Sequence, residues 1–293
     1  MHPKTMHKSH KIFSILLRLL GVAGLLALAV WLVLRVADDP LFFTKKYERL
    51  FWRSHLPPAK GHPVLVLVLD DAGHDLDDLR SFLKLPFPFT VAVIPTAPVA
   101  RASAQLIRQA GKDAFLHQPM QSQGPAPREP HSLLETMSAD EIRHLLSAHL
   151  DTVGPVKGMN NHQGSAFTQN AEKMEIILRL CRERGLLFLD SRTTPQSVSV
   201  SLGTRLDLPV WRNDLFLDHK LTFRALLYRL ADALHRANKQ GYVVMIGHTT
   251  HRKALYPFLK KVYPVLRKKG YRFGFLDQIP PANADELPDE KQK

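Results

Sequence analysis

The sequence predicts a single irregular α/β barrel of roughly seven or eight strand–helix units, preceded by one transmembrane helix. Short apolar runs such as Val64–Leu69 alternate along the chain with helical patterns, which is typical of a buried parallel sheet. No Gly-rich phosphate loop follows the first run, so a nucleotide-binding open sheet is not favoured. A much longer apolar run at residues 12–34 indicates the membrane helix.

The predicted elements follow one another in that alternating order. Ser138 opens one helix with a capping box, Ser-Ala-Asp-Glu, and Gly111 and Gly185 suit helix C-terminal positions. We expect strands at 64–69, 89–94, 113–117, 155–160, 186–190, 210–217, 242–247 and 271–276. We expect helices at 99–110, 138–151, 171–184, 222–239 and 252–269. Strands that alternate with helices pair in parallel through right-handed crossovers, so a closed or nearly closed barrel is predicted.

Composition narrows the class of protein. Hydrophobic residues make up 45% of the 293-residue chain, enough for a sizeable core, and the only cysteine, Cys181, cannot form an internal disulfide. The net charge of +13 fits a protein that works near anionic lipids or envelope polymers. We find no zinc-finger spacing, basic region with heptads or ribonucleoprotein motif, so nucleic acid is not an expected partner.

The N-terminus predicts the compartment. Lysines precede the apolar run and Asp38 and Asp39 follow it, so the positive-inside rule places the N-terminus in the cytoplasm and the domain outside. Small residues near Ala27 and Ala29 offer a weak cleavage site, but large apolar residues follow, and we favour an uncleaved anchor in the inner membrane over a soluble periplasmic product. The predicted organisation is a cytoplasmic basic tail at 1–11, an anchor at 12–36, a linker at 37–62, the barrel domain at 63–279 and a disordered acidic tail at 280–293.

Polar residues follow the predicted strands at their C-terminal ends, where barrels of this type carry their sites. They are Asp70, Asp71, His117, Asn160, Asn161, His162, Asp190, Arg192, Arg212, Asp214 and His248. Two imidazole nitrogens and one carboxylate commonly hold zinc or a similar ion with coordination positions left open. Because successive side chains at a strand end diverge, we expect one of Asp70 and Asp71 to bind the ion and the other to reach a metal-bound water.

Several stretches together resemble the divergent branch of the polysaccharide deacetylase family. They are LVLDDAGH (67–74), LPFPFTVAVIPTAP (85–98), FLHQPM (115–120), GMNNHQGSAFT (158–168), GLLFLDSRT (185–193), RNDLFLDH (212–219) and VVMIGH (243–248). The resemblance covers the chain from about Pro63 to about Ile279, and NNHQGS together with LFLDSRT is its most specific pairing.

The resemblance implies a barrel of the polysaccharide deacetylase type, a divalent metal cofactor such as zinc, and a carbohydrate substrate. It implies that Asp71, His117 and His162 are metal ligands. Asp70 would be the general base, and His248 would protonate the departing amine. The implied reaction is removal of an acetyl group, N-acetyl rather than O-acetyl, from an envelope or exported glycan.

The sequence also departs from the pattern of ordinary family members. Gln121 stands four residues after His117, where a second histidine is usual, so the second imidazole has to come from His162. Asn160 and Asn161 occupy the place of an arginine that steadies the base, a role that Arg192 or Arg212 could take. Asp214, with Asp190 as the alternative, is expected to orient His248.

These departures leave two other hypotheses open. One is an inactive barrel that binds a glycan or an envelope partner. The other is a different metal hydrolase, such as a phosphodiesterase, although no second-metal cluster is evident in the sequence. The sequence does not specify the oligomeric state.

Overall fold

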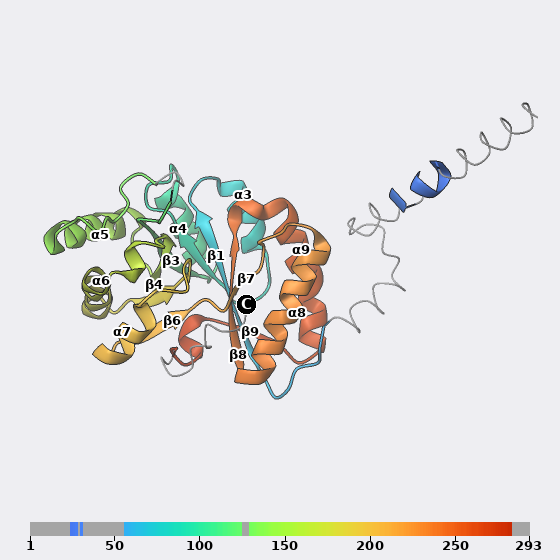
Figure 1. Cartoon of the computed structure of the whole chain (residues 1–293). Coiled ribbons are helices and arrows are strands. Elements are labelled where there is room, and N and C mark those ends of the chain that lie inside the picture. The colour runs from blue at the N-terminus through green and yellow to red at the C-terminus, as the bar shows by residue number, and fades with distance from the viewer. Residues whose placement is uncertain (1–23, 29, 32–55, 125–128, 283–293) are drawn as a thin grey trace, which may run out of the picture.

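The computed structural model describes residues 24–28, 30–31, 56–124 and 129–282. Nine parallel strands form one sheet in the order β6-β5-β4-β3-β2-β1-β8-β7, and β9 pairs with β1. The strands are β1 (Val64–Ala72), β2 (Thr90–Val93), β3 (Asp113–Met120), β4 (Gly158–Gln163), β5 (Leu187–Asp190), β6 (Val210–Arg212), β7 (Leu215–Phe216), β8 (Tyr242–His248) and β9 (Arg272–Gly274). Figure 1 shows the helices arranged around the outside of the curled sheet.

Helices connect successive strands, as the alternating pattern predicts. They are α3 (Leu76–Leu83), α4 (Ala100–Gln109), α5 (Ala139–Val153), α6 (Ala171–Glu183), α7 (Ser199–Leu206), α8 (Phe223–Gln240) and α9 (Arg252–Lys268), with short 3₁₀ turns at Phe167–Gln169, Thr249–His251 and Leu276–Gln278. The predicted capping box at Ser138 is present, with reciprocal bonds to Glu141. Helix α7 was not predicted from the sequence, because its eight residues are too few for apolar periodicity to be a clear signal.

The single strand expected at 210–217 is two short strands, and this break explains how the barrel closes. Asn213 N donates to Asp190 O of β5 at 2.8 Å, whereas Asp214 N donates to Val244 O of β8 at 3.0 Å. The chain therefore passes from one edge of the sheet to the other within two residues. Among the described ladders none joins β6 to β7, so the barrel is closed by the covalent chain rather than by strand pairing.

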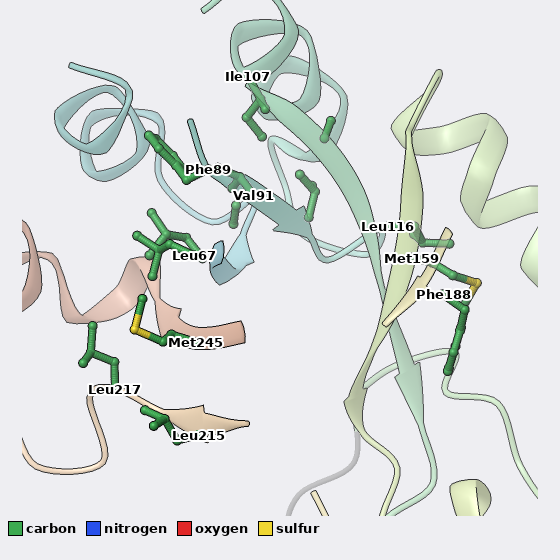
Figure 2. Packing of buried hydrophobic residues seen from close by; sticks show 14 of the residues in the cluster. Leu67, Phe89, Val91, Ile107, Leu116, Met159, Phe188, Leu215, Leu217 and Met245 are labelled. Atoms are coloured by element: carbon green, nitrogen blue, oxygen red, sulfur yellow. The ribbon is translucent and has the colours of Figure 1, made fainter. Parts of the chain in front are cut away.

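Side chains on alternate positions of each strand belong to two separate apolar clusters. Leu65, Leu67 and Leu69 face the helices and join the large outer cluster, part of which Figure 2 shows around Leu67, Leu116 and Met159. Val66 and Val68 belong to a smaller cluster with Phe115, Leu189, Val244 and Ile246 that fills the barrel interior. Gly158 completes this interior, because a Cβ there would lie 2.7 Å from the Phe115 ring.

The predicted anchor at residues 12–36 lies mostly outside the described residues, of which 24–28 and 30–31 are helical and exposed. Within the described part of the chain, no helix combines the length and the apolar character that a membrane crossing requires. At the other end of the predicted linker, Leu56 is fully buried in the outer cluster. The packed domain therefore begins some residues before Pro63.

Candidate metal centre and active site

The polar residues of the site continue the inward-facing series of the strands. In β1 the series Val66, Val68 leads to Asp70, and in β8 the series Val244, Ile246 leads to His248. In the same way His117 follows Phe115 in β3, and Asn160 and His162 follow Gly158 in β4. The barrel thus has an apolar floor and a polar rim at the C-terminal ends of its strands.

Asp71 is the exception to strand alternation. The prediction that Asp70 and Asp71 diverge is wrong, since the carboxylates of both lie next to Nε2 of His117, at 3.6 Å and 3.3 Å. Asp71 has a left-handed backbone with φ 62°, and the β1–β2 register shifts between Leu69 and Ala72. This bulge turns Asp71 back towards the barrel axis, and a strained backbone of this kind is often found where function requires it.

Three ligand atoms from three strands form a nearly equilateral triangle. Oδ1 of Asp71 lies 3.3 Å from Nε2 of His117 and 3.2 Å from Nδ1 of His162, and the two imidazole nitrogens are 3.1 Å apart. Donor atoms around a tetrahedral zinc ion are separated by about 3.3 Å, given bonds of about 2.0–2.1 Å. Oδ1 of Asp71 is buried and accepts no hydrogen bond of normal geometry from the described residues. The donor set and its spacing therefore fit one divalent metal ion.

The side chain of Asn160 connects this triangle to Asp70. His117 Nδ1–H donates to Asn160 Oδ1 at 2.7 Å, which leaves Nε2 as the nitrogen whose lone pair faces the triangle. Asn160 Nδ2 in turn donates to Asp70 Oδ1 at 2.9 Å and to Ser191 Oγ at 3.1 Å. One amide thus fixes the tautomer of a candidate ligand and the orientation of the candidate base.

Asn161, the residue after Asn160, has a structural role. Its Oδ1 accepts from Ser191 N at 2.8 Å, and its Nδ2 donates to Gln163 O at 2.7 Å. These bonds hold the loops that follow β4 and β5, where Gln163 and Arg192 also have left-handed backbones. Asn161 therefore supports the site from outside the barrel interior.

A second group of one carboxylate and two imidazoles lies at the adjacent strand end. His248 N and His248 Nδ1–H donate to Asp218, at 2.7 Å to Oδ2 and 3.0 Å to Oδ1, and His251 Nδ1–H donates to Oδ2 at 2.8 Å. The Asp218 side chain is completely buried. The partner of His248 is therefore Asp218, and the expectation that Asp214 or Asp190 orients this histidine is wrong.

Asp214 and Asp190 have other partners. Asp214 accepts from Val244 N at 2.8 Å and stabilises the passage between β6 and β8. Asp190 accepts from Arg192 N at 2.7 Å and from Ser197 Oγ at 2.6 Å. Polar residues that follow a strand were the signal used to predict the site, and Asp218 follows β7 by two residues. The prediction took Asp214, which follows β6 by two residues, instead.

No arginine is among the groups with the largest effects on Asp70 in the described structure, although Arg192 or Arg212 was expected there. The charges that act on Arg192 are those of Arg212, Asp190, Asp214 and Arg236. The groups that act on Asp70 are His117, His248, Asp71 and the Asn160 amide. In the described structure the base is therefore steadied by an amide and flanked by imidazoles rather than by a guanidinium.

The surroundings shift the pKa values of the two carboxylates of β1 in opposite directions. Burial raises the pKa of Asp70, and the neighbouring imidazoles only partly oppose this. Burial would also raise the pKa of Asp71, but contacts with His117 and His162 bring the pKa of Asp71 far below its usual range. Asp71 is thus a permanent anion suited to hold a cation, and Asp70 is a carboxylate suited to exchange a proton.

The pKa of His248 is also shifted, in the direction that favours the protonated imidazole. Burial would lower the pKa of His248, but the hydrogen bond and charge of Asp218, with the charges of Asp70 and Asp71, raise this pKa to about 9. Burial likewise would raise the pKa of Asp218, and the bonds from His248 lower it. At neutral pH the pair therefore holds a proton on the imidazole of His248, which lies opposite Asp70 in the β1–β8 ladder.

The fold is a parallel α/β barrel with a candidate metal centre at the C-terminal ends of its strands, and comparison with known proteins gives the family. The model of the family described as divergent polysaccharide deacetylase matches residues 67–279, and the chain belongs to this family.

Two relatives are similar in sequence. The chain is 33% identical over 184 residues to an uncharacterized protein of Haemophilus influenzae and 29% identical over 184 residues to the uncharacterized protein YibQ of Escherichia coli. Each alignment covers 63% of this chain, and they cover 66% and 58% of the two relatives. The chain thus matches somewhat less than two thirds of the length of either relative.

Solved structures share the fold. An uncharacterized protein of Agrobacterium tumefaciens C58 superposes with a TM-score of 0.69 at 20% identity, covering 77% of this chain and 93% of that one. The Bc1960 peptidoglycan N-acetylglucosamine deacetylase superposes with a TM-score of 0.50 at 15% identity, covering 78% of this chain and 94% of that one. These superpositions confirm the coarser part of the predicted fold, a curled half-barrel of parallel strands and helices like that of deacetylases.

Proposed function

We propose that the chain is a metal-dependent hydrolase that removes N-acetyl groups from a carbohydrate of the cell envelope. The observation that carries the proposal is the triangle of Asp71, His117 and His162, with Asp70 on one side of it and the Asp218–His248 pair close by. The family description and the shared fold with a peptidoglycan deacetylase support a glycan substrate. We expect the ion to be zinc, because imidazole and carboxylate donors at this spacing suit it.

The residues have separate tasks in this proposal. Asp71, His117 and His162 hold the ion, which when bound acidifies a water molecule and polarises the acetyl carbonyl. Asp70, whose Oδ2 lies 3.6 Å from Nε2 of His117, would accept the proton from the attacking water. Asn160 holds Asp70 in the acceptor orientation. His248, protonated at neutral pH and oriented by Asp218, donates a proton to the departing amine.

We also propose that the enzyme works on the outer side of the inner membrane. The apolar run at 12–34, with lysines before it and aspartates after it, supports an N-terminal anchor with the domain in the periplasm. An envelope glycan would then be within reach of the barrel.

The test uses the full chain, purified in detergent, and the substitution Asp70→Asn. Because this change keeps the shape and removes the proton acceptor, we expect metal content by elemental analysis to stay at one ion per chain. Release of acetate from N-acetylated oligosaccharides should fall by at least about a hundredfold, the usual contribution of a general base. His144→Ala, at an exposed position of α5, is the control and should change neither measurement.

Two outcomes would contradict the proposal. Wild-type protein loaded with zinc that releases no acetate from any N-acetylated glycan of the envelope would favour a glycan-binding barrel instead. Undiminished hydrolysis by the Asp70→Asn variant would remove Asp70 from the mechanism.

A further inference from the structure

A groove with a basic rim lies on the flank of the barrel, away from the metal centre. It has a volume of about 570 Å³ and is formed by the segment after α3 and by the outer face of α9. Four cationic residues line it together with two tyrosines, and they are Lys84, Lys260, Arg267, Lys268, Tyr256 and Tyr263. The lining contains no acidic side chain.

The four cations of this groove are exposed. In the described part of the chain none of them forms an ion pair with a carboxylate, in contrast to Arg143 or Arg179, which pair with Glu183 and Glu175. The groove therefore combines an apolar, aromatic floor with uncompensated positive charge. Such a surface is complementary to an anionic headgroup attached to an apolar chain.

The position of the groove indicates the source of that ligand. Lys269, the C-cap of α9, donates from Nζ to Leu56 O at 2.6 Å and accepts from Ala59 N at 3.0 Å. The segment that leads from the apolar run at 12–34 thus joins the domain beside the end of α9 that carries Arg267 and Lys268. Residues 35–55 could reach at most about 70 Å if fully extended, so an anchored chain keeps the groove within reach of the bilayer.

We propose that this groove docks the domain on the bilayer by binding the headgroups of anionic phospholipids. Each cation near an anionic surface strengthens binding by about fivefold, and tyrosine rings are enriched at the level of the headgroups. Lys84, Arg267 and Lys268 lie where α3 and α9 end and the following strands are about to begin, so they are far from the metal centre at the C-terminal ends of the strands. The proposal rests on the proposed anchor but is independent of the proposed hydrolysis.

The test reconstitutes the full chain in vesicles of phosphatidylcholine with or without phosphatidylglycerol and measures amide hydrogen exchange in residues 253–269. We expect slower exchange in this segment only when phosphatidylglycerol is present. The triple variant Lys260→Gln, Arg267→Gln and Lys268→Gln should lower the ratio of docked to free domain by about a hundredfold and abolish the difference. Acetate release from a soluble substrate should not change, so failure here is distinguishable from failure of the proposed function.

The matched control removes three exposed cations from other elements, Arg182→Gln, Arg205→Gln and Lys220→Gln, and should keep the lipid-dependent protection. Equal loss in this control would mean that net charge and not the groove binds the lipid. Protection that is the same in pure phosphatidylcholine, or that a soluble acidic polysaccharide produces more strongly than phosphatidylglycerol, would overturn the proposal.

Discussion

Two neighbouring groups in this barrel contain the same side chains, one aspartate and two histidines, but in different arrangements. In both groups the ligand atoms lie within 4.8 Å of one another. In the first, Oδ1 of Asp71 accepts no hydrogen bond of normal geometry from the described residues, and the two imidazole nitrogens that face it are as close to each other as to the carboxylate. In the second, both oxygens of Asp218 accept hydrogen bonds.

This difference favours metal binding at the first group and proton binding at the second. An ion bound between Asp218, His248 and His251 would replace the hydrogen bonds that the two imidazoles donate to this carboxylate, which opposes metal binding at Asp218. The Asp71 group has the converse geometry, with His117 fixed by Asn160 so that its remaining nitrogen faces the carboxylate. Residue type alone does not distinguish the two groups, whereas their hydrogen bonds do.

The largest expected effect comes from removing matched histidines from the two groups. His162→Ala should lose the bound metal and lower kcat/KM by about a thousandfold or more, because the stabilisation that the ion gives to the transition state is worth several kcal/mol. His251→Ala should leave the metal content at that of the wild type. Elemental analysis and acetate release measure both, and metal lost equally in the two variants would show that the second group also holds an ion.

A smaller effect is expected when the proton-holding pair is broken. His248 has a pKa of about 9, raised by Asp218 against the effect of burial, so its acid form is present below that pH and disappears as pH rises through it. The basic limb of kcat/KM should therefore fall as pH increases. Asp218→Asn removes the raising charge, so the limb should move to lower pH and the rate at neutral pH should fall by about a hundredfold, with metal retained.

A bound cation would also lower the pKa of His248 by like-charge repulsion, but it does so in both proteins. The displacement of the limb between wild type and Asp218→Asn is therefore the measurement. Identical pH profiles for the two proteins would contradict the role of Asp218.

Much of the fold could be predicted from the sequence because apolar periodicity and helix caps are local signals. The buried run of β1 and the capping box of α5 are of this kind. The break between β6 and β7 could not be predicted, because it depends on the strands to which the backbone amides of Asn213 and Asp214 donate their hydrogen bonds. Helix α7 was missed because its eight residues are fewer than a clear periodic pattern requires.

In the candidate site, too, the residue types could be predicted from the sequence, whereas the backbone geometry and the hydrogen-bond partners could not. The strand-end rule and the family resemblance brought out Asp71, His117 and His162 together, and the structure places their ligand atoms in one triangle. The backbone turn at Asp71 was not predicted, since a left-handed aspartate leaves no mark in the sequence pattern. The partners of Asp70 and His248 were missed because hydrogen-bond partners depend on the register between strands, which sets Asp70 opposite His248 and His117 opposite Asn160.

The smallest of the three expected effects concerns Asn160, whose side-chain amide bonds both the candidate metal ligand His117 and the candidate base Asp70. Asn160→Ala removes the acceptor of the His117 Nδ1–H bond and the donor to Asp70 Oδ1. Loss of such a supporting bond weakens metal affinity by about 10- to 100-fold, so zinc should still bind at saturating concentration. Asn161→Ala is the control on the same strand, because it breaks only bonds to backbone atoms and should lower the unfolding temperature rather than the zinc affinity. If zinc titrations of the two variants give the same affinity, Asn160 fixes neither the tautomer of His117 nor the metal, and the hydrogen-bond argument that separates the two groups would lose its support.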